Sequence, residues 1–345
     1  MHGITSPSSL RAIGACVGMA WGCSVDTPKT PAVWEREPDL YVAHPRLYLT
    51  HKAGARRVVD FPEHPEGGFV MATEAHGFRE DGTVAARSSL PRTLLVGDSH
   101  LAGVVNNTET AAAVLERRLG IDVVNGATGY WGPDEYAAFF GEWVGPGAKT
   151  EDLSVDACVV VFYLGNDFLD GLASAERRGE LRLPRPADHG ERMVRAWEQG
   201  GEVVSQLLNQ DAVLALRPDL GETALTHALD RLLAARDVCS PRFFGVVLLP
   251  TRLDVDPAAE TPTGLARAAL GLAPAMVGQH RALGEQLAVR LGDAGVPVLH
   301  ALPVLRAANM SQHGVFWAKD WHLSTQGHAT VGAAMAAEWG PLLRP

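Results

Sequence analysis

The chain has 345 residues, of which 46% are hydrophobic and 20% charged, a composition typical of a globular protein. Its formal net charge is −10 and its lysines and arginines are not clustered, which argues against nucleic acid or an anionic membrane as the main partner. No stretch is apolar over the roughly 18 residues that a membrane-spanning helix needs, so no transmembrane span is expected.

The N-terminal segment has two interpretations. Residues 10–23, LRAIGACVGMAWGC, carry one arginine before a short apolar run of small residues that ends at Cys23. This pattern is typical of an export signal, so residues 1–25 are interpreted as an export or lipoprotein signal. The protein is then periplasmic or at the cell surface, with or without a lipid anchor. The alternative is a disordered tail on a cytoplasmic protein.

Residues 26–90 are rich in proline, glycine, histidine and charged residues and have little periodicity. They include FPEHPEGG at 61–68 and HGFREDGT at 76–83. We expect an irregular segment here, made of loops and a few short strands that pack on the main domain rather than forming a core of their own.

A regular alternation of strands and helices begins at Arg92. Apolar runs that end at glycine or asparagine indicate buried strands, and amphipathic stretches behind capping residues indicate helices. The expected strands cover residues 92–97, 121–125, 155–165, 243–250 and 296–302. The expected helices cover residues 107–120, 133–143, 275–295 and 324–339. This alternation predicts an α/β domain over residues 91–345, with a parallel sheet covered by helices on both faces.

Residues from about 168 to 235 interrupt the alternation. They hold a charged, proline-containing loop at 175–192 and two expected helices, at 191–209 and 222–237. We interpret this region as an insertion beside the site rather than a separate domain.

Cys158 lies in an expected strand, and Cys239 precedes another. A disulfide between them is one interpretation, but two buried free thiols are preferred. No pair of cysteines has the spacing of zinc ligands, and no metal site is expected.

Several expected strands end in segments that carry chemistry. Gly97-Asp98-Ser99 follows the first strand, residues 125–129 follow the second, and Gly165-Asn166-Asp167 follows the third. Near the C-terminus, KDWHLSTQGH holds Asp320 and His322. Because the carboxyl ends of parallel strands meet at one edge of a sheet, we expect these segments to converge.

Acyl transfer by serine needs a nucleophile, a base, a group that orients the base, and donors for the oxyanion. Ser99 is the candidate nucleophile and His322 the candidate base. Asp320 is the candidate orienting acid, since side chains two residues apart in an extended segment point the same way. The candidate oxyanion donors are the backbone N–H groups of Ser99 and Gly129 and the side-chain amide of Asn166.

His100 directly follows Ser99, which suggests a ready-made pair. Neighbours in sequence at the start of a helix point apart, so His100 is not the expected base. His328 is interpreted as a packing residue rather than a metal ligand.

In their order along the chain, these segments resemble the four sequence blocks of the SGNH hydrolase superfamily, also called GDSL esterases or lipases. Ser99 matches the nucleophile of the Gly-Asp-Ser block, Gly129 the glycine of the second block, and Asn166 the asparagine of the third. Asp320 and His322 match the acid and base of the last block. HGFREDGT is similar to a Gly-Phe-Arg stretch that precedes the serine block in exported bacterial members.

The resemblance covers residues from about 92 to 345. It implies a flavodoxin-like three-layer α/β/α sandwich, ester hydrolysis through an acyl-serine intermediate, and no metal or organic cofactor. Two departures stand out. One residue rather than the commoner two separates Asp320 from His322, and Gly165 directly precedes Asn166.

The same residues leave other functions open. An O-acyltransferase uses the same triad to pass the acyl group to a glycan or small-molecule hydroxyl, and a non-catalytic carbohydrate-binding protein can share the scaffold. The sequence does not identify the small-molecule or glycan ester or the oligomeric state. Five aromatic residues flank the motifs and are expected either to contact a ligand or to pack in the core: Tyr130, Trp131, Phe316, Trp317 and Trp321.

Overall fold

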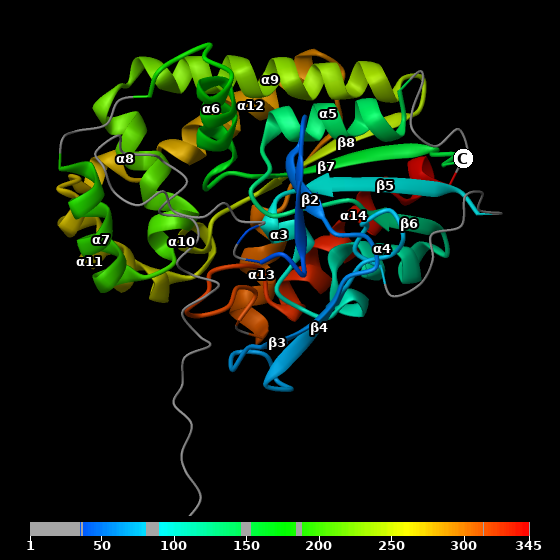
Figure 1. Ribbon diagram of the computed structural model, residues 1–345, viewed down its shortest axis with the longest axis horizontal. Coiled ribbons are helices and arrows are strands. Elements are labelled where there is room, and N and C mark those ends of the chain that lie inside the picture. The colour runs from blue at the N-terminus through cyan, green and yellow to red at the C-terminus, as the bar shows by residue number, and fades with distance from the viewer. Residues whose placement is uncertain are drawn as a thin grey trace, which may run out of the picture.

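The computed structural model describes residue 35 and residues 37–80, 90–145, 153–183, 188–312 and 314–344 (Figure 1). The expected export segment, residues 1–25, lies outside the described residues, so its interpretation stays a prediction. Within the described ranges, the helices are all too short or too polar to cross a bilayer.

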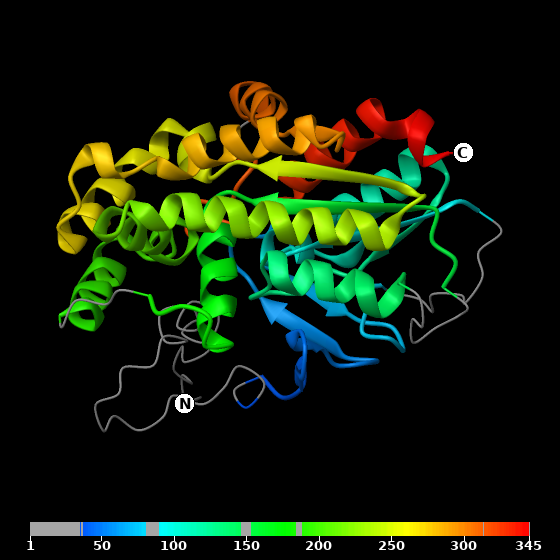
Figure 2. The ribbon, with the colours of Figure 1, turned by 90° about the horizontal axis from the view of Figure 1, so that it is seen from above.

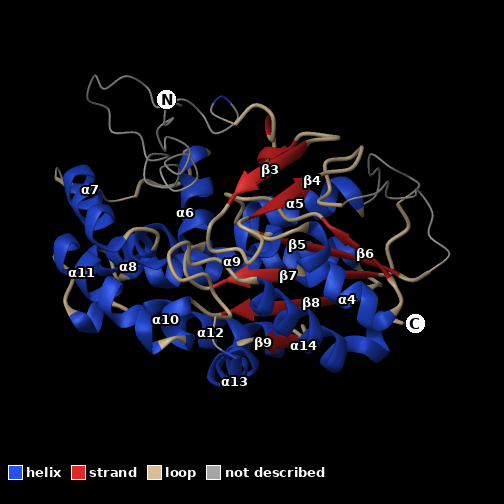
Figure 3. Ribbon diagram, turned by 90° about the horizontal axis from the view of Figure 1, so that it is seen from below, coloured by secondary structure: helices blue, strands red, loops and turns tan. Residues whose placement is uncertain are grey.

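A five-stranded parallel sheet forms the centre of the molecule, with helices on either side (Figure 3). Its strands are β5 (Arg92–Gly97), β6 (Asp122–Asn125), β7 (Ala157–Tyr163), β8 (Phe243–Leu249) and β9 (Val298–His300). They pair in the order β6-β5-β7-β8-β9. Counted along the chain, this is the 2-1-3-4-5 order of flavodoxin-like sheets, in which ligands bind where the strand order reverses. Here that point lies at the ends of β5 and β7.

Helices cover both faces of this sheet. One layer consists of α5 (Pro133–Trp143), α9 (Asp219–Cys239) and α12 (Gln279–Asp293), the first two of which run alongside the strands in Figure 2. The other layer consists of α4 (Ala111–Leu119), α13 (Leu302–Gln312) and α14 (Thr325–Leu343). In β7, Val160 and Phe162 pack in the first layer's core, while Val159 and Val161 pack in the second's, as strand alternation requires. The expected three-layer α/β/α sandwich is confirmed.

The expected helix at 107–120 begins instead as a 3₁₀ turn, Asn107–Glu109, and continues as α4. It ends at Gly120, which adopts the left-handed conformation common at helix ends, with φ 62°.

Between β7 and β8 the chain forms several helices: α6 (Asp167–Arg177), α7 (His189–Gly200), a π-helical turn (Val204–Leu208), α8 (Asn209–Leu216) and α9. Leu225 and Leu232 of α9 belong to the core of the sandwich. Helix α7 and the π-helical turn instead share a separate apolar cluster with α11 (Glu260–Leu270). Figure 1 shows α7, α8 and α11 together at the left end of the sheet, beyond the short helix α10 (Arg252–Val255).

The N-terminal part forms two antiparallel hairpins. One pairs β1 (Tyr41–His44) with β2 (Tyr48–His51), and the other pairs β3 (Arg56–Asp60) with β4 (Gly68–Ala72). Phe61 and Phe69 pack with Val105 and Trp317 of the main domain. The hairpins therefore lie against segments that follow β5 and precede α14.

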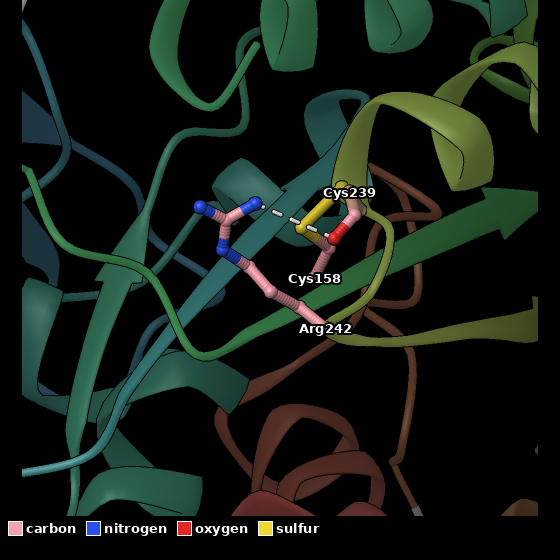
Figure 4. The surroundings of a disulfide bond; sticks show 3 residues. All are labelled: Cys158, Cys239 and Arg242. Carbon is pink, nitrogen blue, oxygen red and sulfur yellow. Dashed lines mark hydrogen bonds between the residues drawn. A yellow bond between two sulfur atoms is a disulfide. The ribbon is translucent and has the colours of Figure 1, made fainter. Parts of the chain in front are cut away.

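A disulfide bond joins Cys158 of β7 to Cys239, the last residue of α9 (Figure 4). The preference for two free thiols was therefore wrong. Helix α9 runs back beside the sheet, so that its last residue lies next to the second residue of β7, with the Cα atoms 6.4 Å apart. That distance suits a disulfide, whereas the sequence separation of 81 residues gives no sign of it.

Candidate active site

Ser99 lies at the end of β5, as the first residue of the short helix α3 (Ser99–Ala102). Asp98 caps this helix by accepting a hydrogen bond from the backbone N–H of His100 at 2.9 Å. Gly97 is required before it, because a Cβ there would lie 2.9 Å from both the Leu101 side chain and the Val161 carbonyl oxygen. The turn therefore holds Ser99, partly exposed, at the edge of the sheet.

Asp320 and His322 lie on a tight loop just before α14. The backbone N–H of Trp317 donates to the His322 carbonyl at 2.9 Å, and Phe316 pairs with Leu323. Between the acid and the base, Trp321 has a φ of 71°, a backbone conformation that residues other than glycine rarely adopt. Such strained positions cluster at functional sites, where the surrounding structure holds them.

The structure brings Ser99, His322 and Asp320 together. The Nε2 atom of His322 lies 2.8 Å from the Oγ of Ser99, and its Nδ1 lies 2.7 Å from the Oδ1 of Asp320. A hydroxyl, an imidazole and a carboxylate thus form one chain of hydrogen bonds. This is the arrangement in which an imidazole can take the proton of an attacking hydroxyl.

Nearby charges favour a protonated His322. Burial opposes a charged imidazole, but the charge and hydrogen bond of Asp320, with the charges of Glu202 and Asp98, raise the pKa of His322 to about 9. Burial likewise raises the pKa of Asp98 to about 6, against the backbone hydrogen bond from His100 and the charge of His322. The carboxylates around His322 therefore favour its charged form, against the effect of burial.

The two further expected residues, Gly129 and Asn166, line the same pocket as Ser99. The backbone N–H of Thr128 donates to the Gly97 carbonyl at 3.2 Å, which ties the loop after β6 to the end of β5. A Cβ on Gly129 would lie 3.7 Å from the Cβ of Ser99. Asn166 precedes α6, and its buried Oδ1 has no hydrogen-bond partner among the described residues.

His100 is held away from Ser99. Its ring stacks on Tyr163, with centroids 3.6 Å apart, and its Nε2 lies 2.9 Å from the Oε1 of Gln206. His328 is buried and accepts a hydrogen bond from the backbone N–H of Ala111 through Nδ1 at 3.2 Å. Both are packing residues, and the described part of the chain has no group of three or more side chains suited to a metal ion.

Ser99, Gly129, Asn166, Asp320 and His322 all line one pocket of about 220 Å³. Residues that sequence reasoning did not select form much of its wall. They come from the hairpins, from α6 and from the segment after α7: Glu37, Leu40, Tyr41, Tyr48, Arg57, Val59, Phe69, Met71, Asp170, Ala173, Glu176, Arg177, Glu202 and Gln206.

The N-terminal segment also supports the loops next to Ser99 and Asp320. The buried Arg79 of the Gly-Phe-Arg stretch donates to the carbonyls of Gly103 and Val105 and, at 3.0 Å, to Asn107 Oδ1. Glu63 accepts from the backbone N–H groups of Lys319 at 2.9 Å and Asp320 at 3.0 Å. The resemblance at 76–83 had marked the stretch that holds Arg79 without predicting a role for it, and no local pattern marked Glu63.

Of the five flanking aromatic residues, only Tyr130 lines the pocket. The indole N–H of Trp131 donates to the Leu49 carbonyl at 2.8 Å, and that of Trp317 to the Val104 carbonyl at 3.2 Å. Trp131, Phe316, Trp317 and Trp321 are buried core residues.

No protein-family model matches this sequence, and no curated protein matches it. Solved structures do match. One is described as a member of the lipolytic protein G-D-S-L family from Veillonella parvula DSM 2008, with 13% identity, 72% of this chain and 97% of that chain covered, and a TM-score of 0.42. Another is an acetylxylan esterase from Geobacillus stearothermophilus, with 11% identity, 74% and 96% covered, and a TM-score of 0.40.

A third match is an alpha/beta hydrolase enzyme from the metagenome of Lake Arreo, Spain, with 12% identity, 76% and 100% covered, and a TM-score of 0.42. The name in the first description is that of the family that the sequence motifs resemble. At these identities and TM-scores, the matches do not establish a function for this chain.

Proposed function

We propose that this chain is a serine hydrolase that cleaves carboxylic esters through an acyl intermediate on Ser99. The observation that carries the proposal is the pair of contacts made by His322, at 2.8 Å to the Ser99 hydroxyl and at 2.7 Å to the Asp320 carboxylate. A serine, a histidine and a carboxylate in this order, open to a pocket, have the geometry of nucleophilic acyl transfer.

In the proposed acylation step, Ser99 Oγ attacks the ester carbonyl while His322 Nε2 takes the hydroxyl proton. Asp320 accepts from Nδ1, which keeps the other ring nitrogen directed at Ser99 and stabilises the imidazolium that forms. The tetrahedral intermediate collapses as its C–O bond breaks, and His322 returns the proton to the leaving alcohol.

We assign the oxyanion to three donors: the backbone N–H groups of Ser99 and Gly129 and the side-chain amide of Asn166. Gly129 approaches Ser99 closely, and Asn166 lines the same pocket as Ser99 and His322, which supports this assignment. Preorganised donors of this kind stabilise charge that develops only in the transition state.

Deacylation repeats these steps with water as the nucleophile. His322 takes a proton from water, the acyl group leaves Ser99 as a carboxylic acid, and Ser99 regains its proton. An alcohol that enters the pocket in place of water would receive the acyl group instead.

We further propose an ester with a compact acyl group and a polar alcohol. The pocket of about 220 Å³ is smaller than the roughly 300–1,000 Å³ that holds drug-sized ligands. One part of its wall is apolar and comes from the hairpins, with Leu40, Val59 and Phe69, and another is polar and comes from α6, with Glu176 and Arg177.

The test is a panel of p-nitrophenyl esters of increasing acyl length, together with acetylated glycans, assayed with the wild type, Ser99→Ala and Ser311→Ala. Ser311 is exposed on α13 and serves as the matched control. We expect the highest kcat/KM for acetyl or propionyl esters, loss of turnover in Ser99→Ala, and wild-type turnover in Ser311→Ala. Turnover retained by Ser99→Ala would refute the assignment. A product acylated on an added glycan would instead identify the acyltransferase function.

We also propose that the chain acts in an oxidising compartment outside the cytoplasm. The Cys158–Cys239 disulfide and the apolar N-terminal run support this location, because disulfides persist mainly in exported proteins. Alkylation and mass spectrometry of the full-length chain from fractionated cells test it. Reduced cysteines in a cytoplasmic fraction would contradict the proposal.

A further inference from the structure

A second carboxyl group, that of Glu202, lines the pocket together with Asp320 and His322. It does not come from the edge of the sheet, where the sequence motifs gather. It comes from the helical region between β7 and β8, just after α7 ends at Gly200.

The backbone around Glu202 is unusual. Gly201 has a φ of 62°, which ends α7, and the chain continues into the π-helical turn Val204–Leu208. The hydroxyl of Ser205 donates to Glu202 Oε2 at 2.9 Å, and the backbone N–H of Gln206 donates to the Glu202 carbonyl at 3.0 Å. π-Helical turns occur frequently at functional sites. This turn fixes the carboxyl group in place.

The same turn contacts the elements that carry the triad. Gln206 accepts from the imidazole of His100 at 2.9 Å, next to Ser99, and its carbonyl accepts from the Tyr163 hydroxyl at 2.9 Å. Trp321, between Asp320 and His322, packs in the apolar cluster of α7, the π-helical turn and α11. The helical region is thus packed against both halves of the site.

The carboxyl group of Glu202 and the imidazole of His322 act on each other. Burial first, and then the charge of Asp320, raise the pKa of Glu202 to about 8, while the charge of His322 opposes this rise. Glu202 is in turn one of the groups that raise the pKa of His322.

We propose that Glu202 is a positioning residue of the active site, a second carboxylate in the pocket whose charge acts on His322 from the helical region. The inference rests on the proposed ester hydrolysis, in which His322 must be neutral to take the Ser99 proton. When Glu202 ionises, it stabilises the imidazolium of His322. It thereby sets the pH above which the base is available and assists the step in which the imidazolium forms.

Other charged groups face His322. Asp320 lies on its own loop, Asp98 precedes α3, His100 lies in α3 and His328 in α14. Arg57 and Arg177 line other parts of the pocket. Asp170 and Glu176 also line the pocket, from α6 as Arg177 does. Of the three carboxyl groups that raise the pKa of His322, Glu202 is the one contributed by the helical region, so its removal leaves the triad and the sheet edge intact.

The experiment compares kcat/KM for a short p-nitrophenyl ester across pH in the wild type, Glu202→Gln, Glu202→Asp and Glu198→Gln. Glutamine keeps an oxygen that can accept from Ser205. Glu198 lies exposed on α7, four residues before Glu202, and does not line the pocket, so Glu198→Gln removes an equal charge outside it.

We expect the midpoint of the acidic limb to lie about one pH unit lower in Glu202→Gln, because the loss of a neighbouring negative charge lowers the pKa of an imidazole. In Glu202→Asp, which keeps the negative charge, we expect the midpoint to lie close to the wild-type value. In Glu198→Gln we expect the wild-type midpoint. If the acidic limb of kcat/KM has the same midpoint in Glu202→Gln as in the wild type, the proposal is overturned.

An NMR titration of the His322 imidazole in the same four proteins separates this proposal from the proposed function. A midpoint unmoved by Glu202→Gln overturns the role of Glu202. A lowered midpoint in a protein that turns over no ester supports that role and overturns only the esterase.

Discussion

The Nε2 atom of His322 lies 2.8 Å from the Oγ of Ser99, although 223 positions separate the two residues in the chain. His100, the next residue after Ser99, points elsewhere and hydrogen-bonds to Gln206. The contact between Ser99 and His322 therefore depends on the turn after β5, on the loop before α14, and on the residues that stabilise these two segments.

Glu63 is predicted to support the loop that carries Asp320. Its carboxylate accepts from the backbone N–H groups of Lys319 and Asp320, and Glu63→Ala leaves both donors without that partner. We expect kcat to fall about 10- to 100-fold, since small displacements of catalytic groups are costly, while the protein stays folded. Steady-state kinetics and circular dichroism measure both.

Glu66 provides the matched control for this experiment, because it is exposed in the same connection between β3 and β4. Glu66→Ala is expected to keep wild-type kcat. Equal activity in Glu63→Ala and the wild type would contradict a supporting role for Glu63.

Asn166 is predicted to donate to the oxyanion. Asn166→Ala is expected to lower kcat by about 10²- to 10³-fold with little change in KM, because the contact forms only in the transition state. Asn166→Asp, which replaces the amide by an acceptor, is expected to lower kcat at least as much. A rise in KM with unchanged kcat would assign Asn166 to ground-state binding instead.

The residues at the sheet edge were predictable from sequence for a physical reason. Apolar runs fixed where the strands end, and parallel strands must bring those ends together, so Ser99, Gly129 and Asn166 were identified by position as well as by type. Asp320 and His322 were identified from their spacing and from the resemblance to a known family. The structure brings all five to one pocket.

The remainder of the pocket depends on tertiary packing that leaves no local signal. Tyr41 and Arg57 lie on hairpins whose position follows from contacts such as that of Phe61 with Trp317. Glu202 lies at the break between α7 and the π-helical turn, within a region expected to be one continuous helix. Cys158 and Cys239 meet only because α9 has the length and direction that return it to β7.

The Cys158–Cys239 disulfide is predicted to stabilise the sandwich. It closes a segment of 81 residues that includes α6, α7, α8 and most of α9. Relative to the oxidised wild type, Cys158→Ala/Cys239→Ala is expected to lose about 2–4 kcal/mol in free energy of unfolding. Urea unfolding with and without reductant measures this. Reductant should lower the free energy of unfolding of the wild type and leave that of the double variant unchanged. Equal free energies of unfolding for the two proteins without reductant would contradict the prediction.

A buried ionic cluster joins the helical region to the sandwich. His280 of α12 lies with Nε2 3.0 Å from Asp254 of α10 and with Nδ1 3.9 Å from Asp211 of α8. Arg281 also pairs with Asp254. Burial disfavours a charged imidazole, but the two carboxylates raise the pKa of His280 to about 9.

This cluster predicts a loss of stability in alkaline solution. The pKa of His280 is about 9 in the folded chain and about 6.5 for an unperturbed histidine. Its contribution to stability is therefore complete below the lower value and is lost as pH rises through the higher one. The free energy of unfolding, measured by urea at about pH 7 and about pH 10, should fall over this range.

Replacement of His280 tests the same cluster directly. His280→Gln is expected to lower the free energy of unfolding at neutral pH by about 3–5 kcal/mol, because the buried carboxylates of Asp211 and Asp254 lose the imidazole between them and Arg281 pairs only with Asp254. The free energy of unfolding of this variant should also decrease less in alkaline solution than that of the wild type. His300, exposed at the end of β9, gives the control His300→Gln. If His280→Gln loses as much free energy of unfolding in alkaline solution as the wild type does, groups other than His280 cause that loss.

Ser99 is predicted to carry the acyl group, and rapid-quench mass spectrometry tests this prediction most directly. The protein is mixed with p-nitrophenyl acetate, quenched in acid within the first turnover and digested with a protease. The masses of the resulting peptides are then measured. We predict one acetyl group on the peptide that contains Ser99 in the wild type, and none in Ser99→Ala. Turnover without this acyl-enzyme, or acetylation that persists in Ser99→Ala, would contradict the account.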